Sequence, residues 1–483
     1  MTVLKFRLRM PPPEEVAVVP ASPLYRGAIG DKSLISDEVL ACMPPDGAIH
    51  DYVCWAVQNT FADPLFHLGA ILPVAAYQAT TRGWGGPWKL PVRGMQGAIQ
   101  TFLVGQAASA KSTSLRMSHR FHVDLLQRYY GQSWQEDKDP WLQSDGTIPG
   151  LLEASHDRFD DDLGISPAVF FHEEASSLLE KGGTVVDHLM QLFDTTDKVE
   201  RHLREYRAMS KLGQTPPNRV VKPAIGAVFC LTLSSSERTL TPDHFEGGLA
   251  SRCLWLMGEA DVDRFLNVVP GCDPEGRARL IERWIQLGAA HAGRRLRGDG
   301  TVAPLSKECQ DVILPLFELY KQATQEGNSA RGSIYMRGIG LCQTIGTVYA
   351  LSCGRLEVSV ADLTAALRLV EHSMATTGHL QHTSQENVIY KLAERSIALI
   401  QRAGTAGMTR TQLNRNHLHV DAETLDRVQR LFEDSGEVFV SKPRTGQRGR
   451  PGEVYLHTDF VTAKSNVIEF RKAPEEAAAD DTD

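Results

Sequence analysis

Short apolar runs alternate with longer amphipathic stretches through the middle of the chain. The apolar runs have the length and flanks of buried strands, and in order they span residues 99–104, 168–171, 224–233 and 254–257. Between and after them, apolar residues recur three or four positions apart, which is the spacing of amphipathic helices. Strands that alternate with helices are typical of an α/β fold. The pattern therefore predicts an α/β core with a mostly parallel sheet.

The pattern changes towards both ends of the chain. Residues 1–45 contain repeated prolines, which predict an extended arm. Residues 46–85 have helical spacing, and residues 265–380 are also mainly helical in pattern. The segment 386–457 looks like a separate small unit. It contains helical stretches at 389–400, from 409 and at 422–432, followed by strand-like runs around a Gly/Arg loop, which is typical of a winged helix-turn-helix.

Charge and composition narrow the function classes. The 483 residues include 51 Lys and Arg against 59 Asp and Glu, a net charge of −8, so any nucleic-acid surface must be a local patch. No run approaches the roughly 18 apolar residues of a membrane span, and the start lacks the apolar region of a signal peptide. Eight scattered cysteines without a C-x-x-C favour buried thiols. We expect a cytoplasmic protein with no membrane partner.

The strongest motif directly follows the first apolar run. Residues 105–113, Gly-Gln-Ala-Ala-Ser-Ala-Lys-Ser-Thr, resemble G-x-x-x-x-G-K-[ST], the Walker A loop that cradles nucleotide phosphates. Lys111 would supply positive charge to the phosphates, and Ser112 would ligate Mg²⁺. Ala110 stands where the motif has glycine, and a positive φ there would cost about 1 kcal/mol of strain. The alternative is a loop with an incidental lysine. The residues expected to bind ATP here are Gly105, Ser109, Ala110, Lys111, Ser112 and Thr113.

An acidic pair follows the second apolar run. Glu173 and Glu174 come directly after Ala-Val-Phe-Phe-His at 168–172. A nucleoside triphosphatase needs one acid to hold Mg²⁺ and another to polarise the attacking water. We assign Glu173 to the metal and Glu174 to catalysis. The alternative is a solvated helix start, where acidic residues favour the helix dipole.

The order of these motifs resembles that of a known group of proteins. The chain is similar to P-loop ATPases of phage, plasmid and genomic-island proteins related to primase-helicases, with an AAA+/MCM-like helicase core. The resemblance covers about residues 50–375. The matching stretches are 86–113, 170–175, 192–197, 225–236, 247–254, 337–341 and 358–370.

The resemblance implies further roles. Thr232, or Ser234, would match the sensor-1 polar residue, although this stretch could simply be a turn. Arg252 would match the catalytic arginine that reaches a neighbouring subunit's nucleotide, and Arg337 the sensor-2 arginine that contacts nucleotide from a helical lid. Both arginines could instead form surface ion pairs. The segment 198–221 would be a basic hairpin facing a DNA channel, or a solvated face. The basic residues that fit this hairpin are Arg201, Arg204, Arg207, Lys211 and Arg219.

A second basic segment lies in the small C-terminal unit. The stretch 442–452 has no acidic residue and carries Lys442, Arg444, Arg448 and Arg450. Flexible, arginine-rich loops suit contact with DNA phosphates and the minor groove. The helical stretch before it carries Asp421, Glu423 and Asp426, which would repel phosphate, so DNA contact should fall mainly to the wing. The alternative is a winged helix that binds protein.

These observations predict a fold class and a function. The fold is an α/β, AAA+-like P-loop core with a helical N-terminal region, a helical lid and a C-terminal winged helix. The function is an ATP-dependent DNA helicase or translocase of a mobile element, using ATP and Mg²⁺ as a homo-oligomer, a hexameric ring. Alternatives are a DNA-binding initiator, loader or regulator with little hydrolysis, and a defence or signalling ATPase with a protein target. The expected parts are an arm 1–45, helical region 46–85, ATPase core 86–262, lid 263–382, winged helix 383–460 and disordered acidic tail 461–483.

Overall fold

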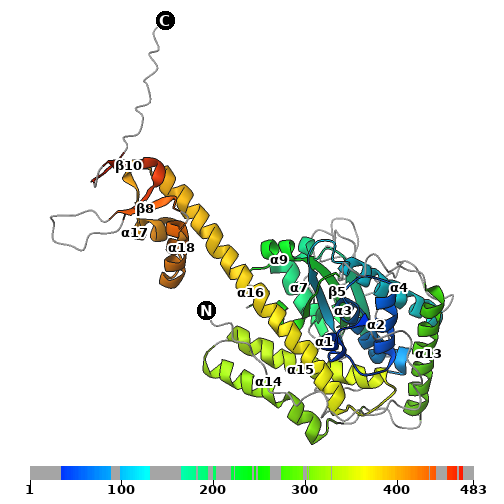
Figure 1. Ribbon diagram of the computed structural model, residues 1–483. Coiled ribbons are helices and arrows are strands. Elements are labelled where there is room, and N and C mark those ends of the chain that lie inside the picture. The colour runs from blue at the N-terminus through cyan, green and yellow to red at the C-terminus, as the bar shows by residue number, and fades with distance from the viewer. Residues whose placement is uncertain are drawn as a thin grey trace, which may run out of the picture. The chain divides into compact units, whose positions relative to one another are not determined.

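The chain forms two compact units, Met1–Gln381 and His382–Asp483 (Figure 1). The computed structural model describes residues 34–86, 88, 98–130, 165–180, 183–193, 200–202, 219–221, 223–241, 244–245, 248–260, 273–296, 302, 304–327, 329–434, 436–441, 454–464 and 467–470. The first unit is a mixed α/β structure around a four-stranded sheet, and the second combines helices with small antiparallel sheets.

The central sheet is parallel in all its pairings, with strand order β2-β5-β1-β6. Its strands are β1 (Gln100–Gly105), β2 (Ser166–His172), β5 (Pro223–Thr232) and β6 (Leu254–Met257). Each lies within about two residues of an apolar run in the sequence. The predicted α/β core with a parallel sheet is therefore confirmed. The order is not sequential, because β5 lies between β1 and β2.

Helices cover both faces of this sheet. Alternate residues of β1 point to opposite faces, so Leu103 joins one hydrophobic cluster while Phe102 and Val104 join the other. The first cluster includes side chains of α2 (Ala48–Gln58), α3 (Pro64–Thr80), α4 (Lys111–Tyr130) and α13 (Pro274–Leu296). The second includes side chains of α6 (Ser176–Leu179), α7 (Gly183–Phe193) and α11 (Leu249–Arg252). Burial on both faces explains why the strands are continuous apolar runs.

Helix α3 is apolar around most of its circumference because it is buried against the sheet. Gly69 lets the helix approach closely. A Cβ at this position would lie 2.6 Å from Leu256 Cδ1, 2.8 Å from Leu103 Cδ2 and 3.0 Å from Thr101 Cγ2. Residues 46–85, predicted as a separate helical region, are thus an integral layer of the α/β unit.

The N-terminal arm ends earlier than the prolines suggest. Within the predicted arm 1–45, helix α1 (Asp37–Leu40) is capped by Ser36, and Ile35, Cys42 and Met43 are buried. The Tyr349 hydroxyl donates a 2.7 Å hydrogen bond to the Cys42 carbonyl. Prolines exclude a long helix here, but they do not prevent single apolar side chains from joining the core. Residues 1–33 lie outside the described residues.

Long helices follow the sheet. They are α13, α14 (Lys307–Gln325), α15 (Ser329–Ser352) and α16 (Val360–Arg402). The sequence suggested one helix at 363–370, another at 389–400 and a domain boundary at 382/383. The boundary between the two compact units falls at 381/382, within one residue of the predicted one, but a single helix, α16, runs through it. The stretch between has no proline, and its single glycine, Gly378, has no atom within 4 Å of a would-be Cβ, so nothing in it stops the helix.

The second unit has its own hydrophobic core, which includes Ile400, Leu413, Val428 and Phe432. A three-stranded antiparallel sheet has the order β7-β9-β8. Its elements are η6 (Gly404–Ala406), β7 (Met408–Thr409), α17 (Arg410–Leu413), the π-helical turn η7 (Asn414–Leu418), α18 (Ala422–Asp434), β8 (Val438–Ser441), β9 (Val454–His457) and η8 (Thr458–Phe460).

The predicted disordered tail begins too early. Strands β10 (Val461–Lys464) and β11 (Val467–Phe470) form an antiparallel pair within it. The reason is visible in the residue types, because β-branched and aromatic residues continue to Phe470 and the acidic run starts only at Glu475. Residues 471–483 lie outside the described part of the chain.

The remaining elements are short. They are η3 (Arg82–Trp84), β3 (Glu200–His202), β4 (Arg219–Val221) and α9 (Leu233–Thr239). Among the described residues, no helix is both long and apolar enough to cross a membrane. The seven cysteines in this part of the chain are buried, and none forms a disulfide.

Replacing Gly69 with valine should destabilise the first unit. The added carbons would meet side chains of β1 and β6 at once, whereas valine at Gly378 of α16 meets open space. We expect Gly69→Val to lower the free energy of unfolding by about 2 kcal/mol more than Gly378→Val. Thermal and urea unfolding of the two variants would measure the difference. Equal losses would contradict the close packing of α3 on the sheet.

Candidate functional site

The loop of residues 106–110 joins β1 to α4 at the carboxyl edge of the sheet. Gly105 begins it, and a Cβ there would lie 2.7 Å from Ser109 Oγ and 2.8 Å from the Gly258 carbonyl. Only glycine therefore lets the loop turn back so tightly. Ala108 and Ala110 have φ of 64° and 59°, so the alanine in the motif does adopt the left-handed conformation that glycine would hold without strain.

Lys111 is the first residue of α4 and its side chain turns back onto this loop. The residue is only 6% exposed. Its Nζ donates a 2.8 Å hydrogen bond to the Gln106 carbonyl and lies 3.4 Å from Ser109 Oγ. Burial lowers the pKa of Lys111. The amide groups at the start of the 20-residue helix add a field that favours anions at the same place.

The acidic pair lies at the end of β2. The Glu174 amide donates to His172 Nδ1 at 3.2 Å, and the Ala175 amide donates to the Cys230 carbonyl of β5 at 3.0 Å. These bonds fix the turn against the sheet. The Glu174 side chain is exposed, and its Oε1 lies 3.4 Å from Ser176 Oγ. Glu173 is partly buried and faces α4.

Thr232 ends β5, where it is in register with Gly105 of β1. Its hydroxyl caps α9, accepting from the Ser235 amide at 3.1 Å and donating to Ser235 Oγ at 2.7 Å. The residue thus lies at the expected edge, but its hydroxyl serves the helix start. Ser234 is exposed next to it, with the two hydroxyl oxygens 3.3 Å apart.

Cys230 of β5 marks the point where the separate motifs meet. Its thiol is buried, and this burial raises the pKa of Cys230 to about 12. The charges of Lys111, Glu173 and Arg116 also act on this thiol. The start of α4 and the end of β2 therefore lie close together, and the contact between Arg116 and Glu173 joins them. Ser112 and Glu173 offer there a hydroxyl and a carboxylate, which Mg²⁺ accepts alongside phosphate oxygens and water.

Arg116 belongs to this group although sequence reasoning missed it. Its guanidinium contacts both carboxylate oxygens of Glu173, and the bond from Nη2 to Oε2 is 2.8 Å. The signal was present, because Arg116 follows Ser112 by four residues and so lies on the same face of α4. No motif singles it out, because its partner comes from a distant strand.

A pocket of about 340 Å³ lies at the end of β6, where Met257 and Glu259 line it. Gly258, between these two residues, contacts the start of the 106–110 loop, since its amide bonds the Val104 carbonyl at 3.1 Å and its carbonyl lies against Gly105. Asp63 lines the pocket and accepts from the amides of Leu65 (2.8 Å) and Glu259 (3.1 Å), while burial raises its pKa. Acidic groups and apolar walls such as Val39 and Met257 suit a nucleoside better than a phosphate.

His372 of α16 lies in the wall of the same pocket. It donates from Nε2 to the Met257 carbonyl at 3.2 Å, and burial lowers its pKa. The imidazole thus adds a flat side chain to the pocket. It also ties the last long helix of the unit to the end of β6.

Arg252 and Arg337 lie together, away from Lys111. Arg252 ends α11 just before β6, whose Leu254 is in register with Thr101, so it lies at the amino edge of the sheet. Its Nη1 donates to the Gly248 carbonyl at 3.0 Å. The Ser333 hydroxyl of α15 reaches Ser251 at 3.3 Å, which brings α15 beside α11.

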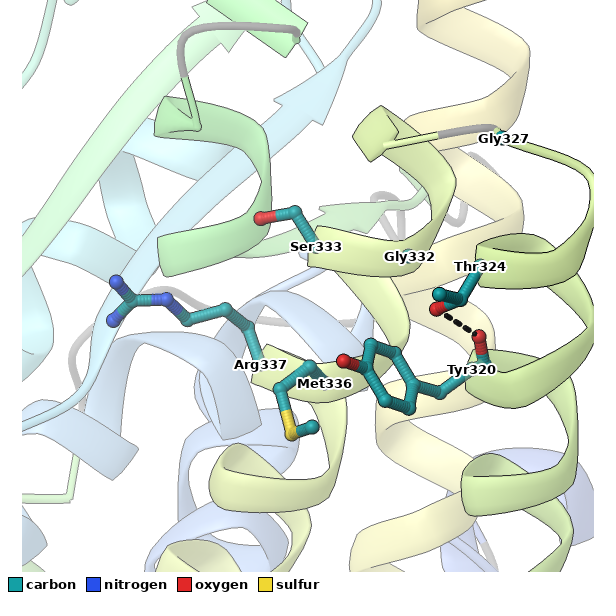
Figure 2. A pocket seen from close by; sticks show the side chains of 7 residues that line it. All are labelled: Tyr320, Thr324, Gly327, Gly332, Ser333, Met336 and Arg337. Carbon is teal, nitrogen blue, oxygen red and sulfur yellow. Dashed lines mark hydrogen bonds between the residues drawn. The ribbon is translucent and has the colours of Figure 1, made fainter.

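Arg337 follows Ser333 by one helical turn and lines a second pocket, of about 440 Å³, between α14 and α15. Figure 2 shows its side chain extending away from Tyr320 and Thr324 on the opposite wall.

The candidate DNA-binding residues fall mostly outside the described residues. Strands β3 and β4 pair antiparallel, as the ends of a hairpin would. Arg201 is in β3 and Arg219 in β4, but their side chains are not described. The other candidates, Arg204, Arg207, Lys211, Lys442, Arg444, Arg448 and Arg450, lie in the stretches 203–218 and 442–453 beyond the described residues.

The acidic residues near α18 have local partners. Asp421 accepts from the Thr424 amide and hydroxyl, both at 2.9 Å, and these bonds lower its pKa. Asp426 forms an ion pair with Arg410 of α17. Arg427 and Arg430 are exposed on α18. The helix is therefore less repulsive to phosphate than its sequence suggested.

Comparisons with family models and with curated proteins give no match. No family model matches the chain, and no curated protein matches it significantly. The candidate site thus rests on the motifs and on where their residues lie.

Replacing Ala110 with glycine should stabilise the protein. Alanine in the left-handed region costs about 1–2 kcal/mol, and the greater freedom of glycine in the unfolded chain offsets about 0.4–1 kcal/mol of that. We expect a net gain of up to about 1.6 kcal/mol in the free energy of unfolding. The control is Ala107→Gly, because Ala107 does not have a positive φ, and it should be destabilising. Urea unfolding distinguishes the two, and effects of the same sign would contradict the loop conformation.

Proposed function

We propose that the chain is a P-loop ATPase of the AAA+/MCM-like kind, which binds ATP at the 106–110 loop. The observation that carries this proposal is the position of the buried Lys111, directly after the loop that follows β1, and of Glu173 at the end of β2. Both lie at the carboxyl edge of a parallel sheet, and Arg116 joins Glu173 to α4. Ligands of open parallel sheets bind at this edge. The left-handed Ala110, immediately before a buried lysine, supports the same reading.

Phosphoryl transfer needs positioning and charge stabilisation more than covalent chemistry. Lys111 would exchange its bond to the Gln106 carbonyl for the phosphates of ATP. Glu174 is exposed at the end of β2, where it could accept a proton from an attacking water. Ser234 is the better placed hydroxyl to orient that water, because the Thr232 hydroxyl caps α9. Mg²⁺ would supply charge neutralisation of the phosphates, held by Ser112 and Glu173.

The pocket beside Gly258 supports a nucleotide over a free phosphate ligand. It is lined by apolar side chains and hydrogen-bond acceptors, and Gly258, between its lining residues Met257 and Glu259, contacts Gly105 at the start of the loop. Asp63, Glu259 and His372 are suited to ribose hydroxyls and a purine base. A nucleoside would occupy this pocket while its phosphates lie on the loop.

The separation of Arg252 from Lys111 supports a site shared between subunits. Thr101 and Gly105 are four residues apart along β1, about 13 Å at 3.3 Å per residue, and Arg252 lies beyond the Thr101 end. The arginine cannot reach the loop of its own chain. An arginine that stabilises charge on the phosphoryl group must then come from a neighbour, in a heterologous contact that closes into a ring. Arg337, beside α11, would act from the same edge, and we propose a hexamer.

The second unit supports a DNA substrate. Helical segments followed by β8 and β9, with the basic stretch 442–452 between these strands, fit a winged helix. Ion pairing of Asp426 leaves Arg427 and Arg430 exposed on α18 for phosphate contact. We therefore propose a DNA helicase or translocase of a mobile element.

A second function, an ATP-binding initiator or loader with little hydrolysis, is favoured by one feature. Glu173 is engaged by Arg116, so the carboxylate proposed for the metal already has a cationic partner. Turnover measurements separate the two functions.

The wild-type protein should hydrolyse ATP faster when DNA is added. Lys111→Ala should abolish nucleotide binding, because no other cation lies in the loop, and Glu174→Gln should keep binding but reduce turnover about 100-fold or more. Phosphate release and binding of a fluorescent ATP analogue measure the two effects. Binding of ATP and DNA without turnover would favour the initiator, and no nucleotide binding would sink the proposal.

Two inactive variants should complement each other when mixed. In the proposed ring, each site takes Lys111 from one subunit and Arg252 from its neighbour. When Lys111→Ala and Arg252→Ala subunits assemble at random, about a quarter of the subunit contacts keep both residues. We expect the mixture to recover a matching share of wild-type turnover, while each variant alone stays inactive. Mixing Lys111→Ala with Glu174→Gln is the control, and the absence of any recovery with Arg252→Ala would place both residues in one subunit's site.

A further inference from the structure

The forked contact between Arg116 and Glu173 lies one helical turn from Ser112. Arg116 Nη2 donates to Glu173 Oε2 at 2.8 Å, and Nε donates to the other carboxylate oxygen. The guanidinium therefore engages both oxygens of the carboxylate. Glu173 is the carboxylate that the proposed function assigns to the divalent cation.

Stability does not explain this pair. The Arg116 side chain is 67% exposed and that of Glu173 is 27% exposed, and ion pairs at such positions contribute little to folding. Buried residues such as Leu115 and Phe121 already hold α4 against the core. The pair also differs from the other exposed arginine pair of α4, in which Arg128 Nη2 lies 3.8 Å from Glu282 Oε2, far from the loop.

The position of Arg116 sets it in competition with a metal ion. A guanidinium and a divalent cation need the same carboxylate oxygens, and their positive charges repel each other. Phosphate groups on the 106–110 loop would add negative charge and offset that repulsion. Without them, the positive charges of Lys111 and Arg116 both act on this edge of the sheet.

We propose that Arg116 is a positioning residue that makes cation binding depend on nucleotide. It holds Glu173 in the nucleotide-free protein and excludes a divalent cation, and it releases the carboxylate when phosphates occupy the loop. This inference rests on the proposed nucleotide site. It concerns the order in which ligands bind, not the hydrolysis step.

Manganese binding to the nucleotide-free full-length chain tests the proposal. Mn²⁺ is the probe, and electron paramagnetic resonance counts the free ion. We expect Arg116→Gln to bind Mn²⁺ about tenfold more tightly than wild type, because a positive charge beside the carboxylate is lost. The matched control, Arg128→Gln, removes an equally exposed arginine from the same helix and should bind as wild type does.

Two further variants assign the effect to Glu173. Arg116→Gln combined with Glu173→Gln should lose the gain in Mn²⁺ affinity. Arg116→Lys keeps the charge without the fork and should lie between wild type and Arg116→Gln. Equal Mn²⁺ affinity in wild type and Arg116→Gln would overturn the proposal, as would a gain that persists without Glu173.

Failure of this inference can be distinguished from failure of the proposed function. Binding of a fluorescent ATP analogue to wild-type protein is measured beside the Mn²⁺ titration. If the analogue does not bind, the nucleotide site is wrong. If it binds and tightens Mn²⁺ binding more in wild type than in Arg116→Gln, the dependence on Arg116 is supported. Equal tightening in both proteins would overturn it.

Discussion

Parallel pairing of β2, β5 and β1 is the constraint on which the candidate site depends. In a parallel sheet every strand ends at the same edge, so residues far apart in sequence arrive together without any local motif linking them. The pairing brings the turn at Glu173 and the end of β5 beside the loop that follows Gly105. It also requires cover on both faces, because such strands are apolar throughout.

Helix α3, which covers one face of the sheet, is connected directly to the candidate site. Asp63 caps α3 through the Leu65 amide and also accepts from the Glu259 amide, just past β6. Gly258 lies between this carboxylate and Gly105. Direct contacts therefore connect the start of α3 to the end of β6, and the end of β6 to the start of the loop. A change in how α3 packs would move the wall of the pocket as well as the core.

The sequence predicted those features that depend on local residue types. Apolar runs located the strands, because a strand that is buried on both faces is apolar at every position. The positive φ of Ala110 was expected because the motif places glycine at this position. Features that depend on distant partners could not be predicted. The placing of β5 between β1 and β2 and the pairing of Arg116 with Glu173 both require the tertiary fold. The boundary between the two units was predicted to within one residue, but the continuity of α16 across it was missed because a mixed polar stretch was taken for the end of a helix.

The two edges of the sheet carry different functional side chains. The carboxyl edge holds the buried Lys111 and the acidic pair, whereas the amino edge holds Arg252 on the short helix before β6. Because β1 and β6 are parallel and in register, no side-chain movement brings Arg252 to Lys111 within one chain. If the proposed ATPase is correct, the arginine can act only when the amino edge of one subunit faces the carboxyl edge of the next. The sheet would then bring Lys111 and the acidic pair together, and it would also keep Arg252 of the same chain away from them.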